Sequence, residues 1–234
     1  MSADGSIPAA RTTAATSQWF TPPALVEPAR RFLNTIDLDP TSCEVANRTV
    51  QAVAYYDAAD DGLALSWYVA GGVFINPPSP PRPWWRKMRD EIEAGHVTRA
   101  VFVGYSIEVL QQFQDDAEWL RRWHVCVPAK RVRYLTTAGD RLATVHRRTL
   151  KALDAYEDAK GRIATADVDP AQVEKLRRAF EASLAETDRL AALDPNALMS
   201  GDAPAHASVV LGYGDAAAGR LEWRAAFGDV GVCW

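Results

Sequence analysis

The most informative stretch of the sequence is Val73-Phe74-Ile75-Asn76-Pro77-Pro78-Ser79. The apolar run that begins at residue 72 predicts a buried strand, and the amide followed by two prolines predicts a stiff turn directly after it. Because open α/β sheets bind ligands outside the carboxyl ends of their strands, we expect this turn to lie at a binding site. The carbonyl oxygens of Asn76 and Pro77 are adjacent acceptors, which suit the two hydrogens of an NH2 group.

The segments around this turn alternate between strand and helix patterns. Strands are expected at 36–38, 72–75, 99–104 and 124–127, and helices at 24–33, 84–94 and 106–121. This alternation predicts an α/β fold with a mainly parallel sheet that is covered by helices on both faces. A strand pattern resumes at 207–213, and we expect further strands at 221–227 and 230–234.

Two amphipathic helical stripes interrupt this pattern between residues 139 and 195. Asp169-Pro170 separates the stripes, with the Asp as N-cap and the Pro at the first helical position. We therefore expect a disordered tail at 1–17, an α/β domain made of 18–138 and 196–234, and a helical hairpin inserted at 139–195. Target recognition and self-association as a homodimer are equally compatible with the hairpin.

Composition narrows the class of protein. The chain has 234 residues, is 48% apolar and carries a net charge of -4, so it can bury a core, and any contact with nucleic acid must come from local basic patches. Its three cysteines are far apart and in no CxxC arrangement, which argues against a disulfide framework and a metal site. Since no signal peptide or bilayer-length apolar run is present, we expect no membrane partner and a cytoplasmic location.

Four further motifs occur in order before the turn. They are Trp19-Phe20-Thr21-Pro22-Pro23, Leu38-Asp39-Pro40, Tyr55-Tyr56, and Asp60-Asp61-Gly62-Leu63 followed by Trp67. Together with Asn76-Pro77-Pro78 they resemble the phage-type DNA N6-adenine methyltransferase family, the Dam-like enzymes of phages and prophages. The resemblance covers roughly residues 17–90. It implies a Rossmann-like class I methyltransferase sheet, S-adenosyl-L-methionine as cofactor, DNA as partner, and a bacterial or phage-infected host cell in which methylation protects DNA from restriction.

The resemblance also implies a role for each matching residue. The cofactor would be held by Trp19, Phe20, Thr21, Pro22, Asp39, Pro40 and Asp61, with Asp39 on its ammonium group. Asp61 would contact the cofactor's adenine, although an Asp-Gly pair is also typical of a simple turn. The catalytic turn would be Asn76, Pro77, Pro78 and Ser79. Its carbonyls would accept hydrogen bonds from the amine of a flipped-out adenine and stabilise the positive charge that develops there.

The sequence departs from the family pattern at one place. A serine, Ser79, stands where the family has Tyr or Phe, so a stacking face would have to come from Trp84, Trp85 or Tyr105, although the two tryptophans fit a core equally well. The glycine-rich loop usual in related methyltransferases is replaced by residues 41–44, a difference that the phage-type family shares. Basic residues expected to contact the DNA backbone, or to form ordinary solvated faces, are Arg82, Arg86, Lys130, Arg131 and Arg133.

Three alternative functions fit the same sequence. The Pro-Pro geometry serves any exocyclic amine, so N4-cytosine methylation is an alternative, although Asn in the first position favours adenine. Ser79 motivates a second alternative, a catalytically weakened relative that still binds DNA or cofactor. The third is an unrelated α/β protein with a helical interaction arm, which requires the ordered motifs to be coincidence.

Overall fold

The computed structural model describes residues 19–68, 71–163, 168–201, 206–214 and 218–234, so the predicted tail at 1–17 lies outside the described residues. The described residues fall into two compact units. One unit is the segment Gly139–Pro195, and the other combines Trp19–Ala138 with Asn196–Trp234. In the part of the chain that is described, no helix is both long and apolar enough to cross a membrane.

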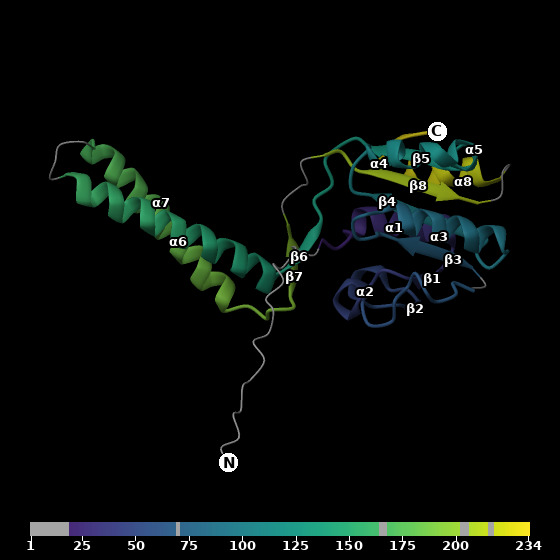
Figure 1. Cartoon of the computed structure of the whole chain (residues 1–234), viewed down its shortest axis with the longest axis horizontal. Helices are drawn as coiled ribbons and strands as arrows, with labels where there is room; N and C mark the ends of the chain where they lie inside the picture. The colour runs from purple at the N-terminus through teal and green to yellow at the C-terminus, as the bar shows by residue number, and fades with distance from the viewer. Residues whose placement is uncertain (1–18, 69–70, 164–167, 202–205, 215–217) are drawn as a thin grey trace, which may run out of the picture. The chain divides into compact units, whose positions relative to one another are not determined.

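A seven-stranded sheet in the order β2-β1-β3-β4-β8-β5-β9 forms the centre of the larger unit (Figure 1). Its strands are β1 (Ile36–Asp39), β2 (Ala54–Tyr55), β3 (Gly72–Ile75), β4 (Arg99–Gly104), β5 (His124–Pro128), β8 (Val209–Tyr213) and β9 (Gly231–Cys233). The neighbours from β2 to β4 pair in parallel, whereas β8 is antiparallel to both β4 and β5, and β9 is antiparallel to β5. Five strands therefore point one way, and this mixed, mostly parallel sheet is compatible with a Rossmann-like fold.

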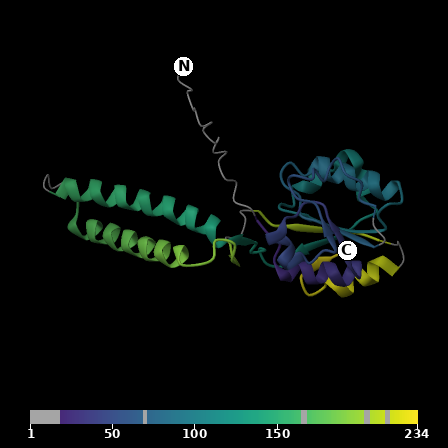
Figure 2. The same ribbon diagram turned by 90° about the horizontal axis from the view of Figure 1, so that it is seen from below.

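Helices cover both faces of this sheet. They are α1 (Pro23–Leu33), α2 (Glu44–Val50), α3 (Arg82–Glu93), α4 (Val109–Gln112), the 3-10 turn η1 (Gln114–Asp116), α5 (Ala117–Leu120) and α8 (Ala218–Phe227). Successive side chains of β3 enter opposite cores: Phe74 packs with α1 and α8, whereas Val73 and Ile75 pack with α3, α4 and α5. Figure 2 shows α1 in purple and α8 in yellow on one face and the blue-green helices on the other. The predicted α/β layering is confirmed.

Two predicted elements are wrong. The expected strand at 221–227 is helix α8, because Trp223, Ala226 and Phe227 recur at helical spacing and are all buried on one face. The expected single helix at 106–121 is broken into α4, η1 and α5. Here Phe113 leaves the helical conformation and its ring stacks on Trp85 with centroids 4.2 Å apart, so packing prevails over local propensity.

A second, two-stranded sheet extends the larger unit. Its antiparallel strands are β6 (Leu135–Thr137) and β7 (Leu198–Ser200). Phe20 adds an isolated antiparallel bridge to Leu135, with backbone hydrogen bonds of 2.9 and 2.8 Å in the two directions. The chain segment before α1 is thereby fixed to the segment after β5.

The smaller unit is a helical hairpin. Its helices α6 (Ala138–Arg162) and α7 (Pro170–Ala191) lie side by side in Figures 1 and 2. As the sequence predicts, Asp169 caps α7, and its carboxylate accepts a hydrogen bond of 2.9 Å from the Ala171 N–H. Hydroxyl groups meet inside the hairpin, where Thr149 Oγ1 lies 2.7 Å from Ser183 Oγ and 3.0 Å from Thr187 Oγ1.

Candidate functional site

The candidate site lies where the order of the sheet reverses. β2 lies on one side of β1, and the chain then returns to the other side to form β3. In open α/β sheets such a reversal leaves a crevice at the carboxyl ends of the two strands. Asp39 ends β1 and Asn76 directly follows β3. From the Leu38–Val73 register, their α-carbons are on the order of 10 Å apart. The predicted carboxylate and the predicted catalytic turn therefore share one edge of the sheet.

The side chain of Asn76 is held in one orientation. Its Nδ2 donates a hydrogen bond of 3.3 Å to the backbone carbonyl of Trp19. Its Oδ1 has no hydrogen-bond partner among the described residues, so this acceptor remains available to a ligand. Pro77 is buried and anchors the turn, whereas Pro78 and Ser79 are exposed. The turn thus presents an oriented carbonyl at the sheet edge.

The predicted cofactor wall at residues 19–22 contacts this turn. Trp19 is 42% exposed, and its ring stacks on Tyr134 with centroids 5.9 Å apart. The other residues of the wall are buried and lead into α1: Phe20, Thr21 and Pro22. The first two residues of the wall are fixed, Trp19 by the hydrogen bond from Asn76 Nδ2 and Phe20 by the bridge to Leu135.

Asp39 is a buried carboxylate with one oxygen to spare. Its Oδ1 accepts hydrogen bonds from the Thr41 backbone N–H at 3.0 Å and from Thr41 Oγ1 at 3.1 Å. Burial raises the pKa of Asp39 to about 6, although the Thr41 hydrogen bonds act in the opposite direction. The nearby Ser42 hydroxyl also lowers this pKa but makes no hydrogen bond of normal geometry. Oδ2 has no hydrogen-bond partner among the described residues, so the site can accept a cation or an N–H group.

The Asp61–Gly62 loop packs against the end of β1. A Cβ at Gly62 would collide with the carbonyl oxygen of Pro40, so only glycine permits this approach. The Gly62 carbonyl accepts a hydrogen bond of 2.7 Å from Trp67 Nε1. Asp61 has a φ of 54°, and its carboxylate accepts a hydrogen bond of 3.3 Å from the Leu63 N–H. Asp61 therefore shapes the turn in which Gly62 approaches Pro40, and Asp61 itself is exposed.

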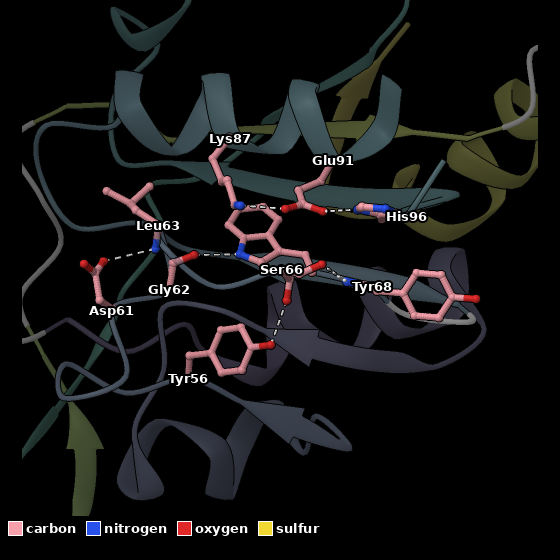
Figure 3. A network of polar contacts seen from close by, with 10 residues as sticks. Tyr56, Asp61, Gly62, Leu63, Ser66, Tyr68, Lys87, Glu91 and His96 are labelled. Carbon is pink, nitrogen blue, oxygen red and sulfur yellow. Dashed lines mark hydrogen bonds and ion pairs between the residues drawn. The ribbon is translucent and has the colours of Figure 1, made fainter. Parts of the chain in front are cut away.

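A polar network on α3 supports this loop (Figure 3). Glu91 pairs with Lys87 Nζ at 2.6 Å and with His96 Nδ1 at 2.7 Å. Burial alone would raise the pKa of Glu91, but the hydrogen bonds from Lys87 and His96 hold it below its usual value. The Lys87 ammonium lies 6.0 Å from the centroid of the buried Trp67 ring, which in turn anchors Gly62. The network holds the loop in place.

The aromatic residues near the turn divide into core and surface groups. Trp85 is fully buried against Phe113 and belongs to the core, whereas Trp84 is partly buried and stacks on the buried Trp67 with centroids 6.4 Å apart. Tyr105 is only partly buried and follows β4, the parallel neighbour of β3. It remains the aromatic candidate of these three at the carboxyl edge.

The predicted DNA contacts are not equivalent. Three of them are exposed on the segment after β5 and have no ion pair within the described residues: Lys130, Arg131 and Arg133. They alternate with Val132 and Tyr134, which are buried in the core beside α1. On α3, Arg86 is exposed and has no ion pair in the described part of the chain, whereas Arg82 forms an ion pair with Asp115. Arg82 is therefore less available to a phosphate than the other four.

Comparisons with known proteins give no family for the chain. No protein-family model matches it. Neither the curated proteins nor the solved structures contain a match. Any function must therefore be argued from the motifs and from the site geometry. Within the described ranges there is also no group of three or more His, Cys, Asp or Glu side chains that could hold a metal ion.

Sequence reasoning missed two features of this site. The first is Thr41, whose backbone N–H and hydroxyl donate hydrogen bonds to Asp39. The sequence offered a sign of this contact, since residues 41–44 stand where related enzymes have a glycine-rich loop. Tyr134 supports the Trp19 ring, and its hydroxyl lies 3.1 Å from Ser208 Oγ. Nothing local in the sequence signals that contact, because Trp19 and Tyr134 are far apart along the chain.

Proposed function

We propose that the chain is an S-adenosyl-L-methionine-dependent DNA methyltransferase that methylates the N6 amine of adenine, built on a class I methyltransferase sheet. One observation carries the proposal: at the reversal of the sheet, Asn76 presents an unpartnered carbonyl while its amide is tied to Trp19. A spare carboxylate oxygen of Asp39 lies at the same edge. These are the two groups that the resemblance assigns to the substrate amine and to the cofactor.

The residues at the end of β1 fit the cofactor. Asp39 is ionised at neutral pH because its pKa is about 6, and Oδ2 is open to the ammonium group. Pro40, next to Asp39 in the chain, packs closely against Gly62. The exposed ring of Trp19 is available for contact with the cofactor. When bound, S-adenosyl-L-methionine supplies a methyl group that its sulfonium already activates. The protein's task is then to hold that methyl in line with the amine.

The Asn76 turn fits the amine. Oδ1 of Asn76 and the backbone carbonyl of Pro77 would accept hydrogen bonds from the two N–H groups of the adenine amine. As the nitrogen attacks, positive charge develops on it, and two fixed carbonyl dipoles stabilise that charge. The hydrogen bond to Trp19 keeps the Asn76 oxygen in place beforehand, so no reorganisation is needed during the reaction.

The exposed basic residues after β5 are suited to contact the phosphates of DNA. Lys130, Arg131 and Arg133 project from a strand-like segment whose next residue, Tyr134, stacks under Trp19. Phosphate contacts there would position the duplex close to the Asn76 turn, as backbone contacts do in other DNA-binding proteins. The target base must still leave the stack, which costs a few kcal/mol.

The direct test incubates the purified chain with methyl-labelled cofactor and duplex DNA of mixed sequence, then identifies the labelled base. Label in N6-methyladenine supports the proposal, and label in N4-methylcytosine would replace it by the cytosine alternative. Cofactor binding without any transfer would point to the weakened relative. No cofactor binding at millimolar concentration would refute the proposal. Asp39→Ala should weaken cofactor binding more than its matched control Asp57→Ala does. The Asp57 carboxylate only accepts a hydrogen bond from the Ala59 N–H within its own turn.

A further inference from the structure

The larger unit contains a cavity of about 730 Å³ that the proposed function does not use. It lies at the edge of the sheet opposite the Asn76 turn. β4 and β5 begin at this edge, and the antiparallel β8 ends there, as the pairing of Ala100 and His124 with Tyr213 and Gly212 shows. The cavity is lined by residues from all these strand ends and from α8.

The lining of this cavity is positively charged. Three arginines are among its lining residues, Arg121, Arg122 and Arg220, and the described lining residues include no Asp or Glu. Arg122 donates a hydrogen bond of 2.7 Å to the Tyr213 hydroxyl and lies 4.3 Å from the centroid of the Trp119 ring. Arg121 and Arg220 have no ion pair in the part of the chain that the structure describes. On a chain with a net charge of -4, this concentration of unpaired arginines favours an anionic ligand.

Two buried polar groups of the lining also lack partners. His124 is 8% exposed and Trp123 is 5% exposed, yet His124 Nε2 and Trp123 Nε1 have no hydrogen-bond partner among the residues that the structure describes. His124 Nε2 faces the first turn of α8, because a Cβ added at Gly219 would lie 3.0 Å from it. Burial, and next to it the charge of Arg220, lowers the pKa of His124, so the imidazole is neutral near pH 7. Buried polar groups are normally hydrogen-bonded, so these two atoms are free to bond a ligand, although Trp85 Nε1 and Trp119 Nε1 outside the lining also lack partners among the described residues.

We propose that this cavity binds a phosphate-bearing ligand of nucleotide size. Guanidinium groups recognise phosphate oxygens through paired hydrogen bonds, and two of the three arginines are free to do so. The volume falls within the roughly 300–1,000 Å³ that is typical of small-ligand pockets. The Trp234 ring, which is 53% exposed, adds aromatic surface for a base or a similar ring. Free nucleotides and the phosphates of a nucleic acid backbone share this chemistry.

The test titrates the full-length chain with inorganic phosphate and with AMP, using calorimetry. In the double variant Arg121→Gln/Arg220→Gln, the affinity for both ligands is expected to fall at least tenfold. Arg224→Gln is the matched control, since Arg224 is an exposed arginine on the same helix but outside the cavity lining, and it is expected to change neither affinity. A second control, Asp39→Ala, is also expected to leave AMP binding unchanged, because Asp39 lies at the other edge of the sheet.

The comparison of ligands separates the two sources of phosphate. AMP binding at least tenfold tighter than phosphate would identify a free nucleotide. Equal binding, together with weaker binding of a short DNA duplex in the double variant, would identify a backbone phosphate. The proposal is overturned if the wild type binds neither ligand, if the double variant binds both as the wild type does while its circular dichroism is unchanged, or if S-adenosyl-L-methionine competes with AMP.

Discussion

Replacement of Asp39 by Asn separates a functional carboxylate from a structural one. The change removes the charge but keeps an oxygen that can accept the two hydrogen bonds from Thr41. Because burial raises the pKa of Asp39 from 3.8 to about 6, the folded chain binds a proton more tightly than the unfolded chain does. Folding stability therefore falls as the pH rises between these two values, and the loss is complete above pH 6.

The two pKa values set the size of the effect. A difference of about two pKa units corresponds to about 3 kcal/mol, so Asp39→Asn is expected to stabilise the protein by up to that amount at pH 8 and not at all at pH 3.5. The same substitution removes a charge-assisted hydrogen bond to the cofactor's ammonium group. Such bonds contribute about 1.5–3 kcal/mol, which weakens cofactor binding by roughly 10- to 100-fold. Higher stability would thus accompany weaker binding.

The measurements are urea unfolding at pH 3.5 and pH 8 and calorimetric titration with S-adenosyl-L-methionine. In the wild type the cofactor affinity is expected to fall about tenfold between pH 7 and pH 5, as Asp39 with a pKa of about 6 becomes protonated, whereas Asp39→Asn should show no such dependence. A variant that is less stable at pH 8 and binds the cofactor as well as the wild type would show that Asp39 merely holds the β1 turn together.

Four other outcomes are expected. Asn76→Ala should lower kcat by roughly 100- to 1,000-fold with cofactor affinity within twofold of the wild type, measured by methyl transfer and calorimetry, and near-normal turnover would make the turn structural. Changing Lys130, Arg131 and Arg133 to Gln together should weaken DNA binding and reduce the slope of log affinity against log salt by about 2–3, whereas an unchanged slope would place the DNA elsewhere. Ser79→Tyr should leave activity equal or improved, since an aromatic face adds roughly 1–3 kcal/mol of base stacking, and loss of activity in a folded variant would mean that the pocket is already filled. Replacing 139–195 by a short Gly/Ser linker should leave a folded domain that binds the cofactor, and an insoluble product would make the hairpin part of the core.

The elements with strong apolar periodicity could be predicted from the sequence. Leu25, Ala29 and Phe32 recur at helical spacing and are buried on the inner face of α1. The continuous apolar runs of β3 and β4 predict strands because both of their faces are covered. The break near Phe113 could not be predicted, since no glycine or proline marks it and only contacts with distant rings cause it.

The same distinction applies to the candidate site. Asp39, Gly62 and Asn76 could be located because the sequence places each at the end of an apolar run or in a tight turn. The ion pair of Arg82 with Asp115 and the burial of Trp85 depend on elements that are distant along the chain, so local pattern gives no sign of them. The cavity with Arg121 and Arg220 was missed for the same reason, because its residues come from several separate segments.

The hydroxyl cluster inside the hairpin has a consequence for its mechanics. Thr149 Oγ1 contacts Ser183 Oγ and Thr187 Oγ1 only in the present alignment of α6 and α7, so a slip of one helical turn would lose these contacts between the helices. Thr149 and Thr187 would keep the hydrogen bonds to Val145 and Ser183 carbonyls of their own helices. Sliding of the two helices is therefore unfavourable, unlike in a hairpin with a uniformly apolar interior. With 25 residues at about 1.5 Å per residue, helix α6 is about 37 Å long. The C-terminal end of α6 is therefore held at a constant distance from its N-terminal end.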